Sequence, residues 1–162
     1  MNEANTQKLY ADFPRLYRNA TDPQSSMKYG FCCNDGWFEL IYKLSANVEA
    51  EAHRLGLDPD SDDWPCALQV KEKFGTLSFY CRTGGEARLE AKAVGEVLSF
   101  RPVPDIQSIR TIIREAEEES ASICEDCGSP AEMREEKWLR VTCDKCESIR
   151  VQKRAELIRQ EG

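Results

Sequence analysis

The sequence predicts an α+β protein in which helices pack on a β-hairpin or small antiparallel sheet, followed by a treble-clef-like four-cysteine zinc module. Three observations lead to this fold class. A helical apolar stripe begins at Trp37, two alternating segments flank Gly75, and two Cys-x-x-Cys pairs stand near the end of the chain. We divide the chain into an α+β body over 1–104, a connecting helix over 105–123 and a zinc module over 124–162.

Size, charge and cysteine content limit the classes of protein to consider. The chain has 162 residues, a formal net charge of −7 and eight cysteines. No apolar run approaches the roughly 20 residues that span a bilayer, and the first residues lack the basic and apolar regions of a signal peptide. We therefore expect a cytoplasmic protein whose cysteines are metal ligands or buried thiols. The acidic balance disfavours binding to nucleic-acid phosphates.

Apolar spacing predicts the helices of the body and of the connection. Asn34 or Asp35 is expected to cap the helix that carries the Trp37 stripe, because a side-chain oxygen there accepts an unpaired N–H. Asp105 is expected to cap the connecting helix in the same way. The predicted helices cover residues 3–12, about 37–55, 86–99 and 106–122.

A β-hairpin is predicted over residues 66–82. Its tip is placed at Lys73 and Phe74, with Gly75 supplying unusual dihedral angles. The register that puts the apolar side chains on one buried face pairs Cys66 with Cys81, Leu68 with Phe79, and Val70 with Leu77.

The four cysteines near the end of the chain predict one structural zinc ion. Cys124 and Cys127 form the first pair, fifteen residues intervene, and Cys143 and Cys146 form the second pair. Two residues between cysteines allow both sulfurs of a tight turn to reach one ion. A hairpin over 131–142 and a helix from the second pair to about residue 160 give the treble-clef order. The helix is expected to pack through Ile149, Ala155, Leu157 and Ile158.

Four thiolates complete a tetrahedral coordination shell, so this zinc has no open position for a catalytic water. The alternative is thioredoxin-type redox chemistry, which also uses Cys-x-x-Cys. The presence of a second pair favours zinc. The other four cysteines, Cys32, Cys33, Cys66 and Cys81, are expected to be buried thiols rather than a second metal site.

A second candidate site is a binding surface on the body. It comprises Asp35, Trp37, Lys71, Lys73, Phe74 and Arg82. The alternative interpretation is a helix cap, a core tryptophan and a solvated hairpin face, and we favour this alternative. A further basic group lies in the zinc module and comprises Lys137, Arg140, Lys145, Arg150, Lys153, Arg154 and Arg159.

Three stretches of the chain resemble a known family. They are Gly30-Phe31-Cys32-Cys33-Asn34-Asp35-Gly36-Trp37-Phe38-Glu39-Leu40-Ile41, Gln69-Val70-Lys71-Glu72-Lys73-Phe74-Gly75-Thr76-Leu77-Ser78-Phe79-Tyr80, and the four-cysteine tail with Trp138. The family consists of small uncharacterised proteins encoded by tailed phages and prophages. The resemblance implies an accessory protein that acts on host machinery, such as a defence system. Cys32 and Asn34 depart from the usual pattern, which has Glu and Gly there.

These observations support three hypotheses about function. The first is a non-enzymatic binding protein that docks on a host protein, with the helix over 105–123 and the stiff segment 101–104 projecting the zinc module outward. The second is a nucleic-acid-binding zinc protein that uses the basic module. The third is an enzyme or small-ligand binder built around Asp35, Trp37 and the hairpin. No membrane association is expected, and the sequence does not indicate an oligomeric state.

Overall fold

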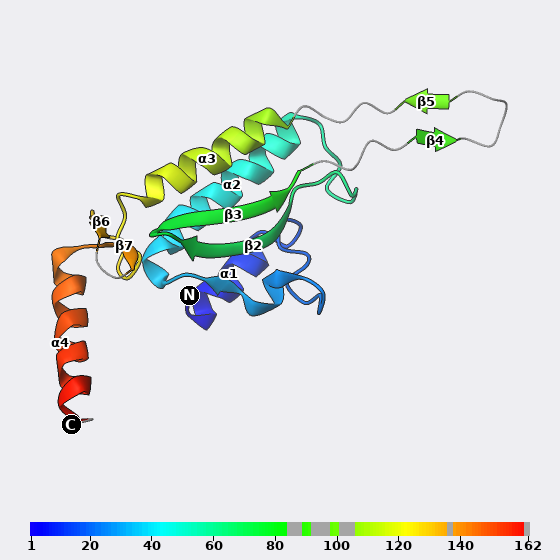
Figure 1. The fold of residues 1–162 in the computed structure, drawn as a ribbon. Coiled ribbons are helices and arrows are strands. Elements are labelled where there is room, and N and C mark those ends of the chain that lie inside the picture. The colour runs from blue at the N-terminus through cyan, green and yellow to red at the C-terminus, as the bar shows by residue number, and fades with distance from the viewer. Residues whose placement is uncertain (84–88, 92–97, 101–105, 136–137, 161–162) are drawn as a thin grey trace.

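The computed structural model describes residues 1–83, 89–91, 98–100, 106–135 and 138–160. It has the predicted α+β architecture, with helices around a small sheet and a terminal cysteine module (Figure 1). The helices are α1 (Glu3–Asp12), α2 (Phe38–Arg54), α3 (Gln107–Ser120) and α4 (Asp144–Gln160), with short 3-10 turns η1 (Ser26–Tyr29) and η2 (Asp35–Trp37). The strands are β1 (Phe31–Cys32), β2 (Cys66–Lys73), β3 (Thr76–Arg82), β4 (Leu89–Ala91), β5 (Leu98–Phe100), β6 (Glu132–Glu135) and β7 (Leu139–Thr142).

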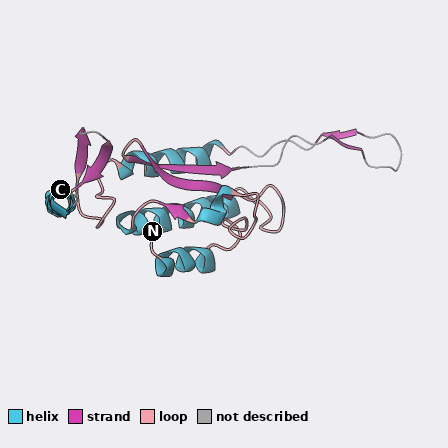
Figure 2. Cartoon of the chain, turned by 60° about the horizontal axis from the view of Figure 1, so that its bottom comes forward, coloured by secondary structure: helices cyan, strands magenta, loops and turns pink. Residues whose placement is uncertain are grey.

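The central sheet is mixed and has the order β1-β2-β3. β2 and β3 form the predicted antiparallel hairpin, and β1 adds a parallel edge that the sequence did not reveal. The rings of Tyr10 and Tyr17 lie against Phe31 of β1, with ring centroids 5.7 and 5.2 Å away. These aromatic contacts hold α1 and the segment after it against β1, the short strand near the N-terminus in Figure 2.

The hairpin register differs from the prediction. Val70 pairs with Phe79 rather than Leu77, and Cys81 pairs with Ala67 rather than Cys66. The register shifts between Ala67 and Gln69, which leaves Leu68 as an extra residue on β2. The predicted Cys66–Cys81 and Leu68–Phe79 pairs are therefore wrong.

The turn of the hairpin explains this difference. Phe74 and Gly75 are its two central residues, with φ of 54° and 84°. A two-residue hairpin turn with positive φ at both positions follows the natural twist of the strands. Placing Gly75 second in the turn moves the tip one residue beyond the predicted Lys73-Phe74. The turn, rather than the apolar pattern, therefore sets the register.

The helix predicted over 86–99 is wrong where the structure describes this segment. Leu89–Ala91 and Leu98–Phe100 are antiparallel strands, with Leu89 opposite Phe100 and Ala91 opposite Leu98. The remaining residues of the predicted helix lie outside the described ranges. Leu89, Ala93 and Val97 recur at the four-residue spacing of a helix, but short apolar segments also form strands, so periodicity alone did not separate the two.

α3 belongs to the body rather than projecting away from it. Ile109 is fully buried and Ala116 is nearly so, both within the main core. The hydroxyl of Ser120 accepts the N–H of Leu77 at 2.9 Å, and the carboxylate of Glu117 accepts the N–H of Phe79 at 2.8 Å. These bonds satisfy the open edge of β3, which would otherwise be exposed for pairing. The expectation of an outward-projecting connecting helix is therefore wrong, and the stiff segment 101–104 lies outside the described residues.

The backbone of the Phe74 turn predicts an unusual stability effect. A left-handed φ at a residue other than glycine or asparagine costs about 1 kcal/mol, and the Phe74 side chain is 71% exposed. We therefore expect Phe74→Asn to raise the free energy of unfolding by about 1 kcal/mol, because asparagine tolerates this conformation. Urea denaturation measures the change. Phe74→Ala keeps the backbone cost and is the control, so an equal gain in both variants would contradict the argument.

Candidate metal centre

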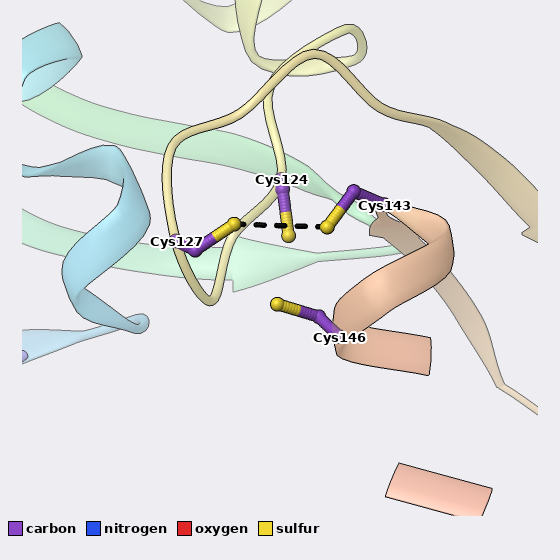
Figure 3. Close-up of side chains that lie close together, drawn as sticks. All are labelled: Cys124, Cys127, Cys143 and Cys146. Atoms are coloured by element: carbon purple, nitrogen blue, oxygen red, sulfur yellow. Dashed lines mark hydrogen bonds between the residues drawn. The ribbon is translucent and has the colours of Figure 1, made fainter. Parts of the chain in front are cut away.

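The four predicted cysteines meet at one point of the structure. Cys124 and Cys127 come from the tight turn after α3, whereas Cys143 precedes α4 and Cys146 lies in its first turn (Figure 3). Between the two pairs, β6 and β7 form an antiparallel hairpin with Arg134 opposite Arg140. The order of turn, hairpin and helix is the predicted treble-clef-like arrangement.

The sulfur positions fit a single tetrahedral ion. All four Sγ atoms lie within 4.8 Å of one another, and the Sγ atoms of Cys127 and Cys143 are 3.7 Å apart. Tetrahedral metal–thiolate bonds of about 2.3 Å place neighbouring sulfurs about 3.8 Å apart. Among the described residues, this is the one group of histidine, cysteine and acidic side chains with such a geometry. The arrangement therefore forms a candidate metal site.

The immediate surroundings lower the pKa of one thiol of the site, that of Cys127, whereas burial raises the pKa of the Cys124 and Cys146 thiols. Hydrogen bonding to Ser129 lowers the pKa of the Cys127 thiol to about 6. Cys124 is fully buried, and burial raises the pKa of its thiol. A bound cation compensates this burial because it stabilises the thiolate form directly. The first pair thus combines the readily ionised thiol of Cys127 with the thiol of Cys124, which ionises more easily when a metal is bound.

The first cysteine turn is docked on the body by main-chain and side-chain hydrogen bonds. The N–H of Gly36 donates to the carbonyl of Glu125 at 2.8 Å. The backbone N–H of Asn34 donates to the Glu125 carboxylate at 3.1 Å, and its side-chain amide donates to Asp126 at 2.7 Å. The indole N–H of Trp37 donates to the carbonyl of Ile123 at 2.9 Å. The metal turn and the start of α2 therefore form one unit.

Two glycines make this docking possible. A Cβ on Gly36 would lie 2.2 Å from the carbonyl oxygen of Cys124 and 2.5 Å from the backbone nitrogen of Gly128. Gly128 itself has φ of 77° and faces the carbonyl of Gly36. Any side chain at Gly36 would meet backbone atoms, which cannot rotate away. The position thus requires glycine for close approach of two main chains.

The candidate binding surface around Asp35 and Trp37 is not assembled. Trp37 is fully buried, and Asp35 accepts the backbone N–H of Asn2 at 2.8 Å and the side-chain amide of Asn5 at 3.1 Å. These bonds anchor α1 and lower the pKa of the Asp35 carboxyl. The expected cap of α2 is also wrong, because neither Asn34 nor Asp35 caps it with its side chain. The cause is that each side chain bonds a distant segment instead.

The hairpin part of that surface is partly or fully exposed, whereas Trp37 is buried and Asp35 is bonded to the start of α1. Lys71 lies over the ring of Tyr80 with its Nζ 5.4 Å from the centroid, and Lys73 lies near the ring of Phe74. Arg82 is also exposed, at the far end of β3. The sequence therefore located a polar hairpin face correctly but joined it to two residues with structural roles.

The four other cysteines form no metal group among the described residues. Cys33 and Cys66 are buried, Cys81 is partly buried, and Cys32 is exposed. Burial raises the pKa of the Cys33 and Cys81 thiols to about 12, which keeps them neutral. The expectation of buried thiols is therefore confirmed for Cys33 and Cys66, holds in part for Cys81, and is wrong for Cys32.

The fold and the site define an α+β protein with a treble-clef-like four-cysteine metal module. Comparisons with protein-family models, curated proteins and solved structures found no match. In the described part of the chain, no helix is both long and apolar enough to cross a membrane.

The Gly36 contact predicts a large effect of a single methyl group. We expect Gly36→Ala to lower the free energy of unfolding by about 3 kcal/mol, because the added Cβ overlaps backbone atoms of the metal turn. The control is Gly56→Ala, where φ is 70° but nothing lies within 4 Å of the added Cβ. That change should cost only about 1 kcal/mol, the conformational penalty alone. Equal losses in urea denaturation would show that docking contributes nothing beyond backbone strain.

Proposed function

We propose that this chain is a non-enzymatic, zinc-stabilised binding protein that docks on another protein in the cytoplasm. The observation that carries this proposal is a set of exposed apolar side chains on and beside the metal module. They have the chemistry of a protein interface and lie on elements whose positions the metal fixes.

Zinc is the ion that this donor set fits best. Four thiolates in a tetrahedron suit Zn²⁺, and a single iron ion is the main alternative for the same geometry. The module contributes Cys124, Val141 and Thr142 as its fully buried side chains, a small core for its length. Small modules of this kind depend on a structural metal for much of their stability. A closed four-sulfur shell supports a structural rather than a catalytic role.

The proposed docking surface lies where the hairpin tip meets the module. A Cβ on Gly75 would lie 2.6 Å from the sulfur of Met133 and 3.1 Å from the backbone nitrogen of Arg140, so the two hairpins touch there. Phe74 and Leu139 are each one residue from this contact. Both are exposed, and the neighbouring Trp138 is 80% exposed. We call Phe74, Trp138 and Leu139 the junction patch, because exposed aromatic groups of this kind are enriched in protein interfaces.

α4 carries further exposed apolar side chains. It leaves the metal centre and runs away from the body in Figure 1. Its large apolar side chains are exposed, so the expected packing of this helix is wrong; they are Ile149, Val151, Leu157 and Ile158. Exposed apolar residues on a helix anchored at one end support a role in binding a partner.

The charges of the module favour protein over nucleic acid. Three of its arginines bind acidic groups of the chain itself. Arg150 contacts Glu147 at 2.8 Å, Arg140 lies 3.8 Å from Glu125, and Arg134 bonds Asp144 at 2.5 Å. Internally paired guanidinium groups contribute less to binding phosphates, because an anion must first displace their partners.

The resemblance to phage and prophage proteins adds a context to this proposal. A small accessory protein of this type would bind a host protein, and such a role agrees with a chain that binds through its surface. On this proposal the protein alters the activity of a host protein by binding to it and catalyses no reaction.

The zinc assignment predicts one ion per chain. Metal analysis of purified protein should give a zinc ratio near one and little iron, because the four sulfurs complete one tetrahedron. Cys127→Ser should reduce the ratio and destabilise the first cysteine turn. Cys32→Ser is the matched control, since Cys32 is an exposed cysteine outside the cluster. Stoichiometric iron, or full zinc retention in Cys127→Ser, would contradict the assignment.

The junction patch predicts which substitutions abolish partner binding. Affinity capture from host cells, with mass spectrometry, should recover a specific protein with the natural chain and lose it with Trp138→Ser or Phe74→Ser. Tyr29→Ser is the control, because Tyr29 is 72% exposed but lies in η1, outside the patch. Capture that is unchanged in both patch variants would exclude this surface.

Nucleic-acid binding is the second candidate, favoured by the exposed Trp138 and the exposed basic residues of α4 in the same module. Fluorescence anisotropy with duplex DNA, single-stranded DNA and RNA at about 0.15 M salt tests it directly, because exposed charges are then screened beyond about 8 Å. Our proposal expects no sub-micromolar binding. Tight binding that is lost in a variant with Lys145, Lys153 and Arg154 changed to Gln would replace the protein-partner proposal.

A further inference from the structure

A second surface feature, away from the metal centre, has the chemistry of a ligand site. A groove of about 450 Å³ lies between β3 and α3. It is at the end of β3 farthest from the hairpin tip, whereas the junction patch is at that tip (Figure 1). Phe79 and Ile113, both buried, lie at its base. This volume is within the range of small-ligand sites.

The rim of the groove is positively charged. Arg82 comes from β3, and Arg110 and Arg114 come from α3 one helical turn apart. Arg114 contacts Glu118 at 3.2 Å. Within the described ranges, the guanidinium groups of Arg82 and Arg110 have no ion pair or hydrogen bond. Like charges gathered around one groove repel one another, and a bound anion removes that cost.

The acidic residue in the groove is already engaged. Glu117 lines it, but its carboxylate accepts the N–H of Phe79 at 2.8 Å, which fixes it against the strand edge. Among the described residues, the groove is thus lined by three guanidinium groups and one carboxylate that has a structural partner, while Glu118 pairs with Arg114. The local balance is basic, in contrast to the acidic chain as a whole.

The strand edge adds a backbone donor. The N–H groups of Leu77 and Phe79 on this edge are bonded by Ser120 and Glu117. The alternation of a strand puts the N–H of Cys81 next on the same edge. No side chain among the described residues accepts from it, and Cys81 lines the groove. Guanidinium groups beside a backbone N–H are the donors that oxyanions bind.

We propose that the groove between β3 and α3 binds an oxyanion, the phosphate or carboxylate group of a ligand. Arg82 and Arg110 bind the anionic group from opposite walls, and Arg114 joins them by exchanging Glu118 for the ligand. The apolar base formed by Phe79 and Ile113 receives the uncharged part of the ligand. The same oxyanion can belong to a free phosphorylated molecule or to a phosphorylated side chain of a protein.

Titration with inorganic phosphate, followed by NMR of the ¹⁵N-labelled zinc-loaded protein, tests the site. Backbone amide signals of Cys81, Arg82 and Thr83 should shift in a saturable way at millimolar phosphate. Changing both Arg82 and Arg110 to Gln should weaken binding at least about tenfold, because a charge-assisted hydrogen bond contributes more than the free energy of a tenfold change. Both side chains are exposed, so the fold should persist, and amide spectra without phosphate will verify this.

Arg154→Gln is the charge-matched control, because Arg154 is exposed on α4 and distant from the groove. It should bind phosphate as the natural chain does. No saturable shift up to about 10 mM phosphate, weaker than any affinity expected of three guanidinium groups, would overturn the proposal. Equal binding by the double variant would overturn it as well.

Two further ligands distinguish the source of the oxyanion once phosphate binds. One is adenosine monophosphate, and the other is a short phosphoserine peptide compared with its unphosphorylated form. Tighter binding of the nucleotide than of phosphate assigns the groove to a free ligand, and tighter binding of the phosphopeptide assigns it to a protein segment. Either outcome supports an oxyanion site. Substitutions in the junction patch should leave the affinity for both ligands unchanged.

Discussion

The close approach of two main chains at Gly36 and Gly128 is the constraint on which the rest of the structure depends. It brings the metal turn into direct hydrogen bonding with the start of α2, while Trp37 fixes the end of α3 through the carbonyl of Ile123. Two helices and the metal site are thereby joined at one point. A fully buried indole with its N–H paired gives this junction both apolar packing and a satisfied donor.

This junction couples the metal to the body in a way that a flexible tail could not. The N–H of Glu125 donates to the carbonyl of Val141 at 3.1 Å, so the docked turn also holds β7. Thr142 then donates to Glu147 at 3.0 Å, which links β7 to the first turns of α4. Loss of the ion would release Cys143 and Cys146 from the turn. The positions of β7 and α4 relative to the body therefore depend on the same small set of contacts.

The sequence was most informative where the chemistry is local. The spacing of the four cysteines predicted that their sulfurs lie close together, because few arrangements of two Cys-x-x-Cys turns form a tetrahedral site. The bounds of helices α1 and α2 followed from the sequence, although the cap expected for α2 was wrong. The register of the hairpin did not, since one bulge and a Phe74-Gly75 turn shift every pair and neither has a strong signal in the apolar pattern.

Residues with long-range partners were the hardest to interpret. Asp35 and Trp37 had the composition of a binding surface, yet their partners are 33 and 86 residues away in sequence. The sequence did not indicate a site at Arg110 and Arg114, because only the packing of α3 against β3 brings them to the same groove as Arg82. A single sequence contains no signal for such pairings, since each depends on how separate elements are placed.

The protein has two chemically different surface regions that its net charge does not indicate. Apolar side chains gather beside the metal module, and guanidinium groups gather at the opposite end of β3, on a chain that is acidic overall. Phe74 has a further cost, because its left-handed backbone would suit asparagine or glycine better. Strained residues persist where the surrounding structure or a function compensates for them. A large exposed ring at a hairpin tip, in a conformation that other residues adopt more easily, is the kind of feature that the proposed docking function requires.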